Sequence, residues 1–479
     1  MKILFIYPNA QGYQRVSLGA SVLITILKNN GHEVELFDTT FMRSSNIDNV
    51  LRQEAGLVKP TEEIKANYLT DEQIEFALLY RLAKFKPDIV CATIVEDNYR
   101  YCNSLLKKIK EADLDIPIVV GGSTPTVAPE VLIKNPNIDH VIVGEGEESI
   151  LDLIEEFSEK RNYWKVYFQH YTDLDTLPIQ DLSLWDERHF RKAYDGKIYK
   201  AGFIETSRGC INNCSYCINH AWKKLYKVKK SKHFRRKSID KVIEEAKYLK
   251  EKHDFNMFFF TDDDFLFMGK KRIREFAQKW YKEVDLPYWI NTRTEVITEL
   301  KLDQLQANCI GIGFGVESGS GWLRRNILNR KGHTNEQIVE IFDMIRAWGG
   351  IRTTANFMIG FPAERENDIY KTINLARKIN ADSVDMTFVS PYYGTEIHRV
   401  CQRLGYIEVD DEPGFEGMAK KVSMRAEPTI NLPQIRKERL IEVYNNFQAY
   451  LEHHSFYHVD KYTETQKVMR ALHEIRKAY

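Results

Sequence analysis

The sequence predicts an α/β protein in which a doubly wound, Rossmann-like domain is followed by a partial (β/α)6 barrel and a helical C-terminal region. Three observations predict this order. Five short apolar runs alternate with helical patterns before residue 150, six strand-like runs alternate with helices from 201 to about 400, and the rest is irregular and then helical. A chain of 479 residues also exceeds what one compact core usually needs.

The first domain is expected over residues 1–150. Its five strands are short runs that are apolar or alternate between apolar and polar residues, at 2–7, 32–38, 88–95, 116–122 and 140–146. A helical pattern over 17–29 ends before Gly31, which suits the position just past a helix. Sheets of this kind bind ligands beyond the carboxyl ends of their strands, so the loops that follow the strands are the candidate binding loops.

Residues 151–200 are expected to connect this domain to the barrel. The barrel strands are expected at 201–207, 257–262, 288–293, 309–317, 353–361 and 383–390. Helical patterns lie between them, at 239–252, 271–281, 301–306, 335–348 and 366–378. Six βα units over residues 201–400 suit a partial barrel, because a full eightfold barrel needs more units. Residues 401–479 form the helical C-terminal region, with helices expected over 432–453 and 463–477.

Composition narrows the choice of partners and compartment. Lys plus Arg and Asp plus Glu are equal at 68 each, so net charge favours no polyanionic partner. The N-terminus lacks the apolar stretch and cleavage site of a signal peptide, and no run reaches the roughly 18 apolar residues of a membrane span. Seven cysteines in so long a chain do not indicate a disulfide framework. We therefore expect a cytoplasmic protein with reduced thiols and no membrane span.

Three of the seven cysteines lie close together, in SRGCINNCSYC. Cys210, Cys214 and Cys217 follow the first barrel strand. The active sites of barrel enzymes lie at the carboxyl ends of the strands. Zinc is one interpretation, with His220 as a fourth ligand, although no second cysteine pair follows. Three unrelated core cysteines are another, which the polar, glycine-containing loop disfavours. A cubane iron–sulfur cluster held by only three thiolates would leave one iron open to a small molecule.

This segment resembles the C-x-x-x-C-x-x-C motif of the radical S-adenosylmethionine (SAM) superfamily. ETSRGCINNCSYC is similar to the form found in the branch with an N-terminal cobalamin-binding domain, and VVGGSTPTVAPE and VIVGEGEESI resemble the end of that domain. FFFTDDDF, FGVESGS, MIGFPAE and SPYYGTEI each resemble a barrel segment of the same branch, and they occur in its order. The resemblance covers about residues 1–400.

The resemblance implies that Cys210, Cys214 and Cys217 hold a [4Fe–4S] cluster, whose open iron chelates the amino and carboxylate groups of SAM. One electron, from a donor such as flavodoxin or ferredoxin, then cleaves a carbon–sulfur bond and releases a 5′-deoxyadenosyl radical. Tyr216 matches the aromatic position near the adenine, although simple packing of the loop would also explain it.

Strand ends supply the other residues that the resemblance implies near SAM. Glu317 and Ser318 match the position that binds the ribose of SAM or its polar end. Arg293 could pair with the SAM carboxylate or bridge structurally to the glutamate two residues further on. Gly360 and Phe361 close the fifth barrel strand, where backbone can approach the adenine.

The first domain is implied to bind cobalamin. The loop PNAQGYQRVSLG carries neither the Asp nor the His of the D-x-H-x-x-G motif, so no histidine of this loop would ligate cobalt. The nucleotide tail would lie in the crevice of the sheet, where glycine backbone and hydroxyl groups can approach it. The residues implied at this site are Thr93, Gly121, Gly122, Ser123, Gly144, Glu145 and Gly146. The missing histidine also leaves open a degenerate domain.

Two charged segments have several interpretations. TDDDF, at 261–265, could orient SAM, substrate or cobalamin; a divalent metal site and helix capping by Asp264 are the alternatives. KKLYKVKKSKHFRRK, at 223–237, could hold an anionic substrate, bind RNA or be a solvated surface. Nucleic acid is not expected as a partner, because the net charge is zero and no RNA-binding module is found.

The leading interpretation is a cobalamin-dependent radical SAM enzyme that methylates an unactivated carbon of a small-molecule substrate. A 5′-deoxyadenosyl radical would abstract hydrogen, and methylcobalamin would supply the methyl group. One alternative is cyclisation, ring contraction or rearrangement without methyl transfer. Another is a non-catalytic cobalamin or iron–sulfur binding protein.

Overall fold

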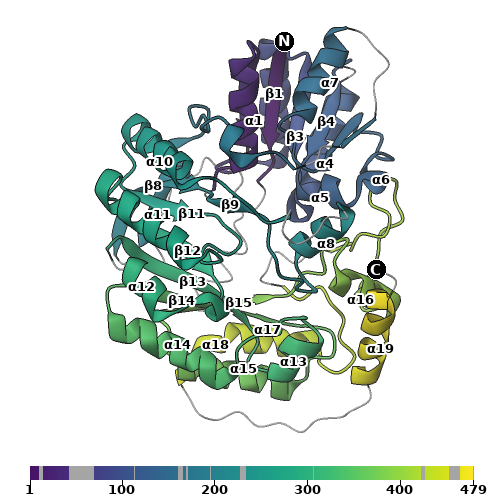
Figure 1. Ribbon diagram of the computed structural model, residues 1–479. Coiled ribbons are helices and arrows are strands. Elements are labelled where there is room, and N and C mark those ends of the chain that lie inside the picture. Colours follow the sequence, from purple (N-terminus) through teal and green to yellow (C-terminus); the bar gives the residue numbers. More distant parts are fainter. Residues whose placement is uncertain are drawn as a thin grey trace.

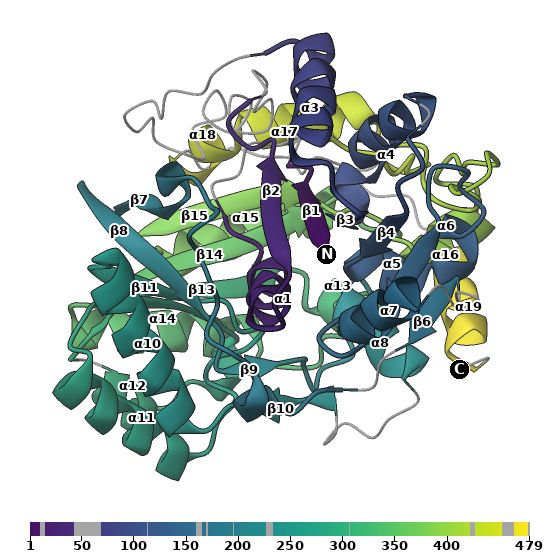
Figure 2. The same ribbon diagram turned by 90° about the horizontal axis from the view of Figure 1, so that it is seen from above.

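The computed structural model contains two β-sheets that consist mainly of parallel strands, one in each half of the chain (Figure 1). It describes residues 1–9, 15–42, 69–112, 114–159, 165–168, 171–194, 196–226, 233–305, 307–421, 427–452 and 464–477. The first domain lies above the barrel in Figure 1 and in front of it in Figure 2. The predicted fold class is confirmed.

The first sheet has six parallel strands in the order β2-β1-β3-β4-β5-β6. The strands are β1 (Lys2–Tyr7), β2 (Glu33–Asp38), β3 (Ile89–Thr93), β4 (Ile118–Gly121), β5 (His140–Val143) and β6 (Val166–Phe168). The first five are the strands expected from the sequence. The sixth lies within residues 151–200 and was not predicted, because three residues give too short a pattern to recognise.

Helices cover both faces of the first sheet. The helices α1 (Leu18–Asn29) and α7 (Ser149–Ser158) pack on one face, and α3 (Asp71–Phe85) and α4 (Glu96–Glu111) pack on the other. Two short helices, α5 (Ser123–Val127) and α6 (Pro129–Leu132), follow β4. Because successive side chains of a strand point to opposite faces, the buried residues of each strand divide between two apolar clusters.

The second sheet has seven strands in the order β15-β14-β13-β12-β11-β8-β7. The six parallel strands are β8 (Lys197–Ile204), β11 (Met257–Phe260), β12 (Tyr288–Thr292), β13 (Cys309–Glu317), β14 (Arg352–Ile359) and β15 (Ser383–Phe388). The seventh, β7 (Arg191–Tyr194), pairs antiparallel with β8 and was not predicted. Since β15 and β7 are the two edges of this sheet, the barrel is open, as expected for a partial barrel.

Helices on the outside of the barrel alternate with its strands. They are α10 (Ile239–His253), α11 (Lys270–Glu283), α12 (Glu299–Leu305), α13 (Gly321–Asn326), α14 (Asn335–Trp348) and α15 (Glu366–Ile379). Three short elements follow β8: β9 (Ser207–Arg208), helix α8 (Ile218–Leu225) and β10 (Arg235–Arg236), which pairs with β9. The cysteine motif lies between β9 and α8.

The C-terminal region is helical, and its last helix agrees with the one expected over 463–477, whereas the helices before it differ from the expected one. Its helices are α16 (Glu396–Arg403), α17 (Lys437–Asn445), α18 (Phe447–Glu452) and α19 (Glu464–Lys477). The prediction of a single helix over 432–453 was wrong. Arg436 has extended backbone and caps the start of α17, and Asn446 separates α17 from α18.

The segment between α16 and α17 packs back on the first domain. Tyr99 of α4 stacks on Phe415, with ring centroids 4.4 Å apart, and its hydroxyl donates to Gly414 O at 2.6 Å. Arg100 pairs with Asp410 at 2.6 Å. The C-terminal region therefore fastens the first domain at α4.

Residues 181–189 fasten the first domain at a second place, near α1 and β2. Lys28 pairs with Asp181 at 2.7 Å, and Trp185 Nε1 donates to Ser21 Oγ at 2.9 Å. These contacts, together with those at α4, hold the first domain over the open barrel. Among the described residues, no helix combines the length and apolar character needed to cross a bilayer.

The packing of the barrel can be tested by a substitution at Trp280. Its side chain is fully buried, it meets Phe258 and Phe260 edge-on at 5.5 and 5.2 Å, and its Nε1 donates to Leu286 O at 2.8 Å. Trp280→Ala should lower the free energy of unfolding by about 3–5 kcal/mol, because it leaves a large cavity. Chemical denaturation followed by circular dichroism measures this loss.

The neighbouring Tyr281, which is 61% exposed, provides the control. Tyr281→Ala should change the free energy of unfolding by no more than about 0.5 kcal/mol. Equal losses for the two variants would contradict the packing described for the barrel.

Candidate active site

A cavity of about 340 Å³ lies between the first domain and the barrel. Its walls come from α1, from the carboxyl ends of β3, β4 and β5, and from the segments that follow β8 and β11. Tyr171, Trp222 and Tyr226 complete its lining. The cavity therefore lies where strand ends of both sheets meet, which is the usual place for a ligand in parallel sheets.

Glycine shapes the first-domain wall of this cavity. Gly122 has φ +114°, and a Cβ added there would lie 2.6 Å from Ile94 O, so this position suits only glycine. Thr126 Oγ1 donates to Gly122 O at 2.7 Å and accepts from Gly144 N at 3.0 Å. These bonds tie the loops after β4 and β5 together and fix the shape of this wall.

Six of the seven residues implied for cobalamin line this cavity: Thr93, Gly121, Gly122, Gly144, Glu145 and Gly146. Ser123 begins α5 and is not part of the lining. Phe5, Leu23, Ile142 and Ile150 add apolar wall on the α1 and α7 side of the sheet. Such a wall suits a flat, largely apolar group. Of the loop after β1, residues 10–14 lie outside the described residues.

The side chain of Lys223 holds the cysteine loop in shape. Lys223 of α8 donates to the carbonyl oxygens of Cys210, Ile211 and Asn212 at 3.3, 2.9 and 2.8 Å. Gly209, next to Cys210, has φ +84°, and an added Cβ would lie 2.4 Å from His233 O. The loop thus folds around one buried ammonium group, and a side chain at 209 would displace it.

The three thiols are free and lie among hydrogen-bond donors. Asn212 donates to Cys210 Sγ through both its backbone N and its Nδ2, each at 3.4 Å, and Arg293 donates to Cys214 Sγ at 3.6 Å. Burial raises the pKa of Cys217 to about 12. Thiols in such a site become thiolates when a metal binds them, and N–H donors then stabilise the sulfur charge.

The alternative zinc ligand, His220, contacts a carboxylate: its Nδ1 lies 3.6 Å from Glu396 of α16. Burial lowers the pKa of His220 to about 4. No group of three or more His, Cys, Asp or Glu side chains is arranged to hold a metal ion within the described part of the chain. A cubane cluster, by contrast, takes each thiolate on a different iron.

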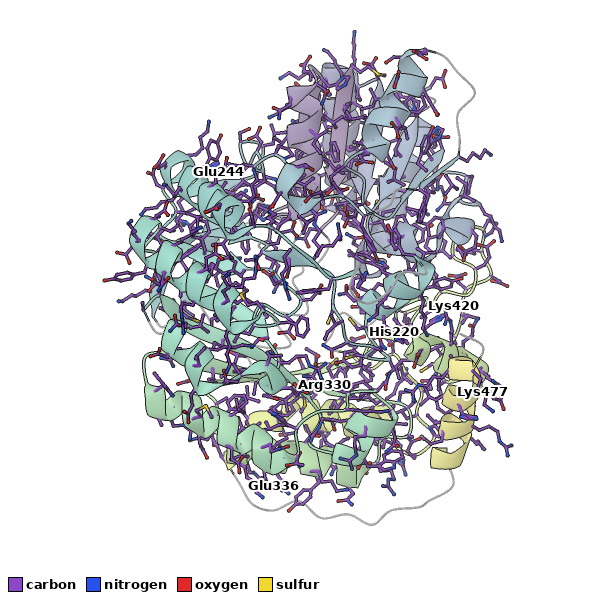
Figure 3. All side chains as sticks on the ribbon, in the orientation of Figure 1. His220, Glu244, Arg330, Glu336, Lys420 and Lys477 are labelled. Carbon is purple, nitrogen blue, oxygen red and sulfur yellow. The ribbon has the colours of Figure 1, made fainter. Side chains whose placement is uncertain are left out.

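Tyr216 and Glu317 meet beside the cysteine loop. Tyr216 donates to Glu317 Oε1 at 3.0 Å, and Arg330 lies 3.2 Å from the same oxygen. Glu317 adopts φ +71°, which is strained for a residue with a side chain. Arg330 also donates to Gly315 O. In Figure 3 Arg330 lies in the interior of the molecule, whereas Glu336 and Lys477 lie at its periphery.

Arg330 was missed in the sequence, because no motif marks an arginine that reaches back to the end of β13. Arg293 pairs with Glu295 at 2.8 Å, which is the structural alternative considered for it, and also reaches Cys214. Burial would raise the pKa of Glu295, but the charges of Arg330 and Arg293 outweigh it and lower the pKa to about 2. Glu295 is therefore an anion that holds both arginines beside the cysteine loop.

Three of the other implied SAM residues contact protein groups. Ser318 Oγ lies 3.2 Å from Thr372 Oγ1 and accepts from Ser320 N at 3.1 Å, so its hydroxyl fixes the turn after β13. Gly360 N and Phe361 N donate to Glu364 at 2.5 and 3.1 Å. The ring of Phe361 lies 6.1 Å from that of Tyr216. Phe361 therefore supports the Tyr216 ring from the end of β14.

The carboxylates of TDDDF have separate places. Asp262 accepts from Thr206 and Ser207 and thereby holds the start of the cysteine segment. Asp264 accepts from Thr292 Oγ1 at 2.6 Å. Asp263 lines the cavity, and burial raises its pKa to about 6.

The cations of the basic stretch that the structure describes are engaged within the protein. Lys223 holds the cysteine loop, and Lys237 pairs with Glu245 at 2.8 Å. Residues 227–232 of this stretch lie outside the described residues. The described part therefore contributes to the structure around the cavity.

Comparison with known proteins assigns both halves of this cavity wall. A family model for the Radical SAM superfamily matches residues 204–376, and one for a B12 binding domain matches residues 62–154. The chain is 26% identical over 362 residues to an uncharacterized methyltransferase of Pyrococcus horikoshii. The aligned region spans 72% of this chain and 76% of that protein.

Two further proteins are similar. The anaerobic magnesium-protoporphyrin IX monomethyl ester cyclase of Rubrivivax gelatinosus is 27% identical over 362 residues, which span 71% of this chain and 63% of the cyclase. The structure of the radical SAM methyltransferase TsrM of Kitasatospora setae, with cobalamin and a [4Fe–4S] cluster bound, has the same fold. It matches with a TM-score of 0.61 at 18% identity, over 86% of this chain and 81% of that chain.

The two family matches follow one another along the chain as the two sheets do, and each includes residues that line one side of the cavity. They imply an enzyme whose cofactors are a [4Fe–4S] cluster, SAM and cobalamin. The chain therefore combines a radical SAM domain with an N-terminal B12 binding domain, in the order found in the cobalamin-dependent branch of the radical SAM superfamily.

Proposed function

We propose that this enzyme transfers a methyl group to an unactivated carbon of a small-molecule substrate. One observation carries the proposal: a single cavity is lined by the glycine loops of the cobalamin-binding domain and by Gly209, beside the first cysteine. Substrate and cobalamin could then lie in one cavity, beside the loop that would carry the SAM-bearing cluster. The similarity to an uncharacterized methyltransferase supports the same activity.

The chain provides groups that fit each cofactor. Cys210, Cys214 and Cys217 would hold the cluster, and the donors from Asn212 and Arg293 would stabilise its sulfur ligands. The six lining residues of the first domain would hold the nucleotide tail of cobalamin. When bound, SAM on the cluster supplies a 5′-deoxyadenosyl radical, and cobalamin supplies a methyl group.

Tyr216 and Glu317 would position SAM. The carboxylate of Glu317 can accept from the ribose hydroxyls, and the ring of Tyr216 offers a face to the adenine. Arg330 and Phe361 act behind them, since Arg330 holds the carboxylate and Phe361 packs on the ring. Arg293 would pair with the SAM carboxylate through the edge of its guanidinium group that Glu295 does not occupy.

A second candidate function is radical cyclisation, ring contraction or rearrangement without methyl transfer. The similarity to an anaerobic cyclase favours it. The mass of the product separates the two functions, because methylation adds one methyl group and the alternatives add none.

The organisation that we propose has four parts. Residues 1–150 bind cobalamin, residues 151–200 connect the domains, residues 201–400 form the radical SAM barrel and residues 401–479 form the C-terminal region. We further propose that the enzyme works in the cytoplasm and takes its electron from a flavodoxin or a ferredoxin.

The cysteine loop yields the first test of this function. Anaerobically reconstituted protein should hold about four irons, with one iron free of protein ligands. Replacing Cys210, Cys214 and Cys217 with Ala should abolish the charge-transfer absorbance of the cluster. Absorbance and iron analysis measure both results, and the buried Cys309→Ala variant, which lies outside the loop, should retain the cluster. Stoichiometric zinc that resists replacement by iron would contradict the assignment.

The loop over residues 8–19 yields the second test, because it contains no histidine. We expect purified protein to bind hydroxocobalamin with its dimethylbenzimidazole displaced from cobalt and no histidine in its place. Electron paramagnetic resonance (EPR) of the cob(II)alamin state should lack the superhyperfine splitting that an axial nitrogen produces. Clear nitrogen splitting would refute this expectation, and failure to bind any cobalamin would remove the methyltransferase assignment.

Glu317 yields the third test. Glu317→Gln keeps the size of the side chain but removes its charge, so SAM affinity should fall about tenfold or more. Equilibrium binding of SAM to the reconstituted protein measures the change without a substrate. Glu340→Gln, an exposed position on α14, should leave the affinity unchanged. Unchanged SAM binding by the Glu317 variant would exclude this residue from the SAM site.

A further inference from the structure

A row of aromatic rings crosses the inner face of the second sheet. Phe259 of β11 is in register with Phe203 of β8 on one side and with Trp289 of β12 on the other. Its ring centroid lies 6.0 Å from that of Phe203 and 6.3 Å from that of Trp289. The next residue, Phe260, meets Trp280 of the outer helix α11. Because successive side chains of a strand point to opposite faces, the row points into the barrel.

Glycine makes room for this row on the neighbouring strand, β13. Trp289 is in register with Gly311, and a Cβ added there would lie 2.2 Å from Cε3 and from Cζ3 of the indole ring. A Cβ added at Gly313 would lie 3.4 Å from Cζ2 of the same ring. The indole ring therefore lies across both glycines. Barrel interiors are normally filled by layers of bulky side chains, so glycine at these positions leaves space that β13 does not fill.

Two polar groups meet above the second of these glycines. A Cβ added at Gly313 would lie 2.4 Å from Asn291 Oδ1 and 3.5 Å from Trp289 Nε1. Asn291 is exposed, although β12 lies in the middle of the sheet, and Trp289 is half-buried. Within the part of the chain that the structure describes, neither the carboxamide nor the indole N–H has a hydrogen-bond partner, and neither is shut off from solvent. Both groups are therefore available to a ligand.

The aromatic row borders the candidate active site. Thr261, which lines the cavity, follows Phe259 by two residues and so points to the same face. On β13 the glycine pattern continues to Gly315, where an added Cβ would lie 2.5 Å from Oε1 of Glu317, the residue proposed to bind SAM. A molecule that rests on Trp289 would thus lie beneath the SAM site, inside the barrel.

A flat ring that bears a polar group fits these neighbours. Aromatic rings gain from stacking on one another, so the open side of the indole suits an aromatic ring better than a saturated one. The indole N–H can only donate a hydrogen bond, whereas the carboxamide of Asn291 can donate and accept. We propose that the substrate carries an aromatic ring with an amide or carbonyl group, that Trp289 stacks on the ring and that Asn291 binds the polar group. The inference rests on the proposed function, since it names the substrate class of the same enzyme.

Two probes with one carbon skeleton separate the two contacts. 1-Naphthamide offers an aromatic double ring and a carboxamide, and decahydronaphthalene-1-carboxamide carries the same carboxamide on a saturated double ring. Ligand-observed nuclear magnetic resonance titration gives their affinities for full-length protein reconstituted with its cluster, SAM and hydroxocobalamin. Wild-type protein should bind the aromatic probe about fivefold more tightly than the saturated one.

Three substitutions should change these affinities in different ways. Trp289→Leu keeps an apolar side chain but removes the ring, so the preference for the aromatic probe should fall to about twofold or less. Asn291→Leu keeps the size of the side chain but removes the carboxamide, so both probes should lose affinity by about fivefold. Gly313→Ala should act like Asn291→Leu, because its Cβ would displace Oδ1 of Asn291.

Matched changes on the outer helices are the controls. Trp348→Leu, at the end of α14, and Asn367→Leu, an exposed position of α15, should keep both wild-type affinities. Iron content, SAM binding and hydroxocobalamin binding should be the same in all variants, because Trp289 and Asn291 do not line the cavity. Circular dichroism confirms that each protein is folded.

Four results would overturn the proposal: no binding of 1-naphthamide, equal affinity for the two probes, a preference that survives Trp289→Leu, or unchanged affinities in Asn291→Leu. A parallel loss of SAM or hydroxocobalamin binding would also overturn it, by placing these residues at a cofactor. Wild-type protein that binds neither cofactor would instead refute the proposed function, so the two failures are distinguishable. Because Gly313→Ala reaches the carboxamide from another strand, misfolding of one variant leaves the other as a test.

Discussion

The meeting of two sets of strand ends is the constraint on which the rest of the structure depends. In each parallel sheet the loops that can bind ligands lie at the carboxyl edge, and here both edges border one cavity. Neither sheet could enclose this space alone. The contacts of α4 with the C-terminal region and of α1 with residues 181–189 matter because they keep the two edges opposed.

Buried cations give the cavity wall its shape. Lys223 gathers three carbonyl oxygens of the cysteine loop, Arg330 holds the strained end of β13, and Arg208 joins the two domains. An unpaired charge in such places would be strongly destabilising, so each cation specifies the backbone or carboxylate that surrounds it. The loops that would carry the cofactors are therefore organised by ionic contacts more than by apolar packing.

Much of this could be predicted from local pattern. Strand and helix periodicity gave both sheets, and the glycine loops and the cysteine motif marked both walls of the cavity. Patterns failed where a residue acts through a distant partner. Glu147 and Arg208 are 61 residues apart, and Arg330 reaches back to Glu317 around α13, so neither pair has a sequence signature. The contacts of single hydroxyl and backbone groups could not be predicted either. The partner of Ser318 Oγ or of Gly360 N depends on which residues lie beside it in space.

The packing of Phe415 on Tyr99 has a consequence for how the chain is made. Ribosomes release a protein from its N-terminus, so α4 emerges more than 300 residues before the segment that stacks on Tyr99 and pairs with Arg100. Until that segment arrives, an apolar face of the newly made first domain has no cover. Such faces are sites of misassembly and of chaperone binding during synthesis. The last part of the chain thus completes the first.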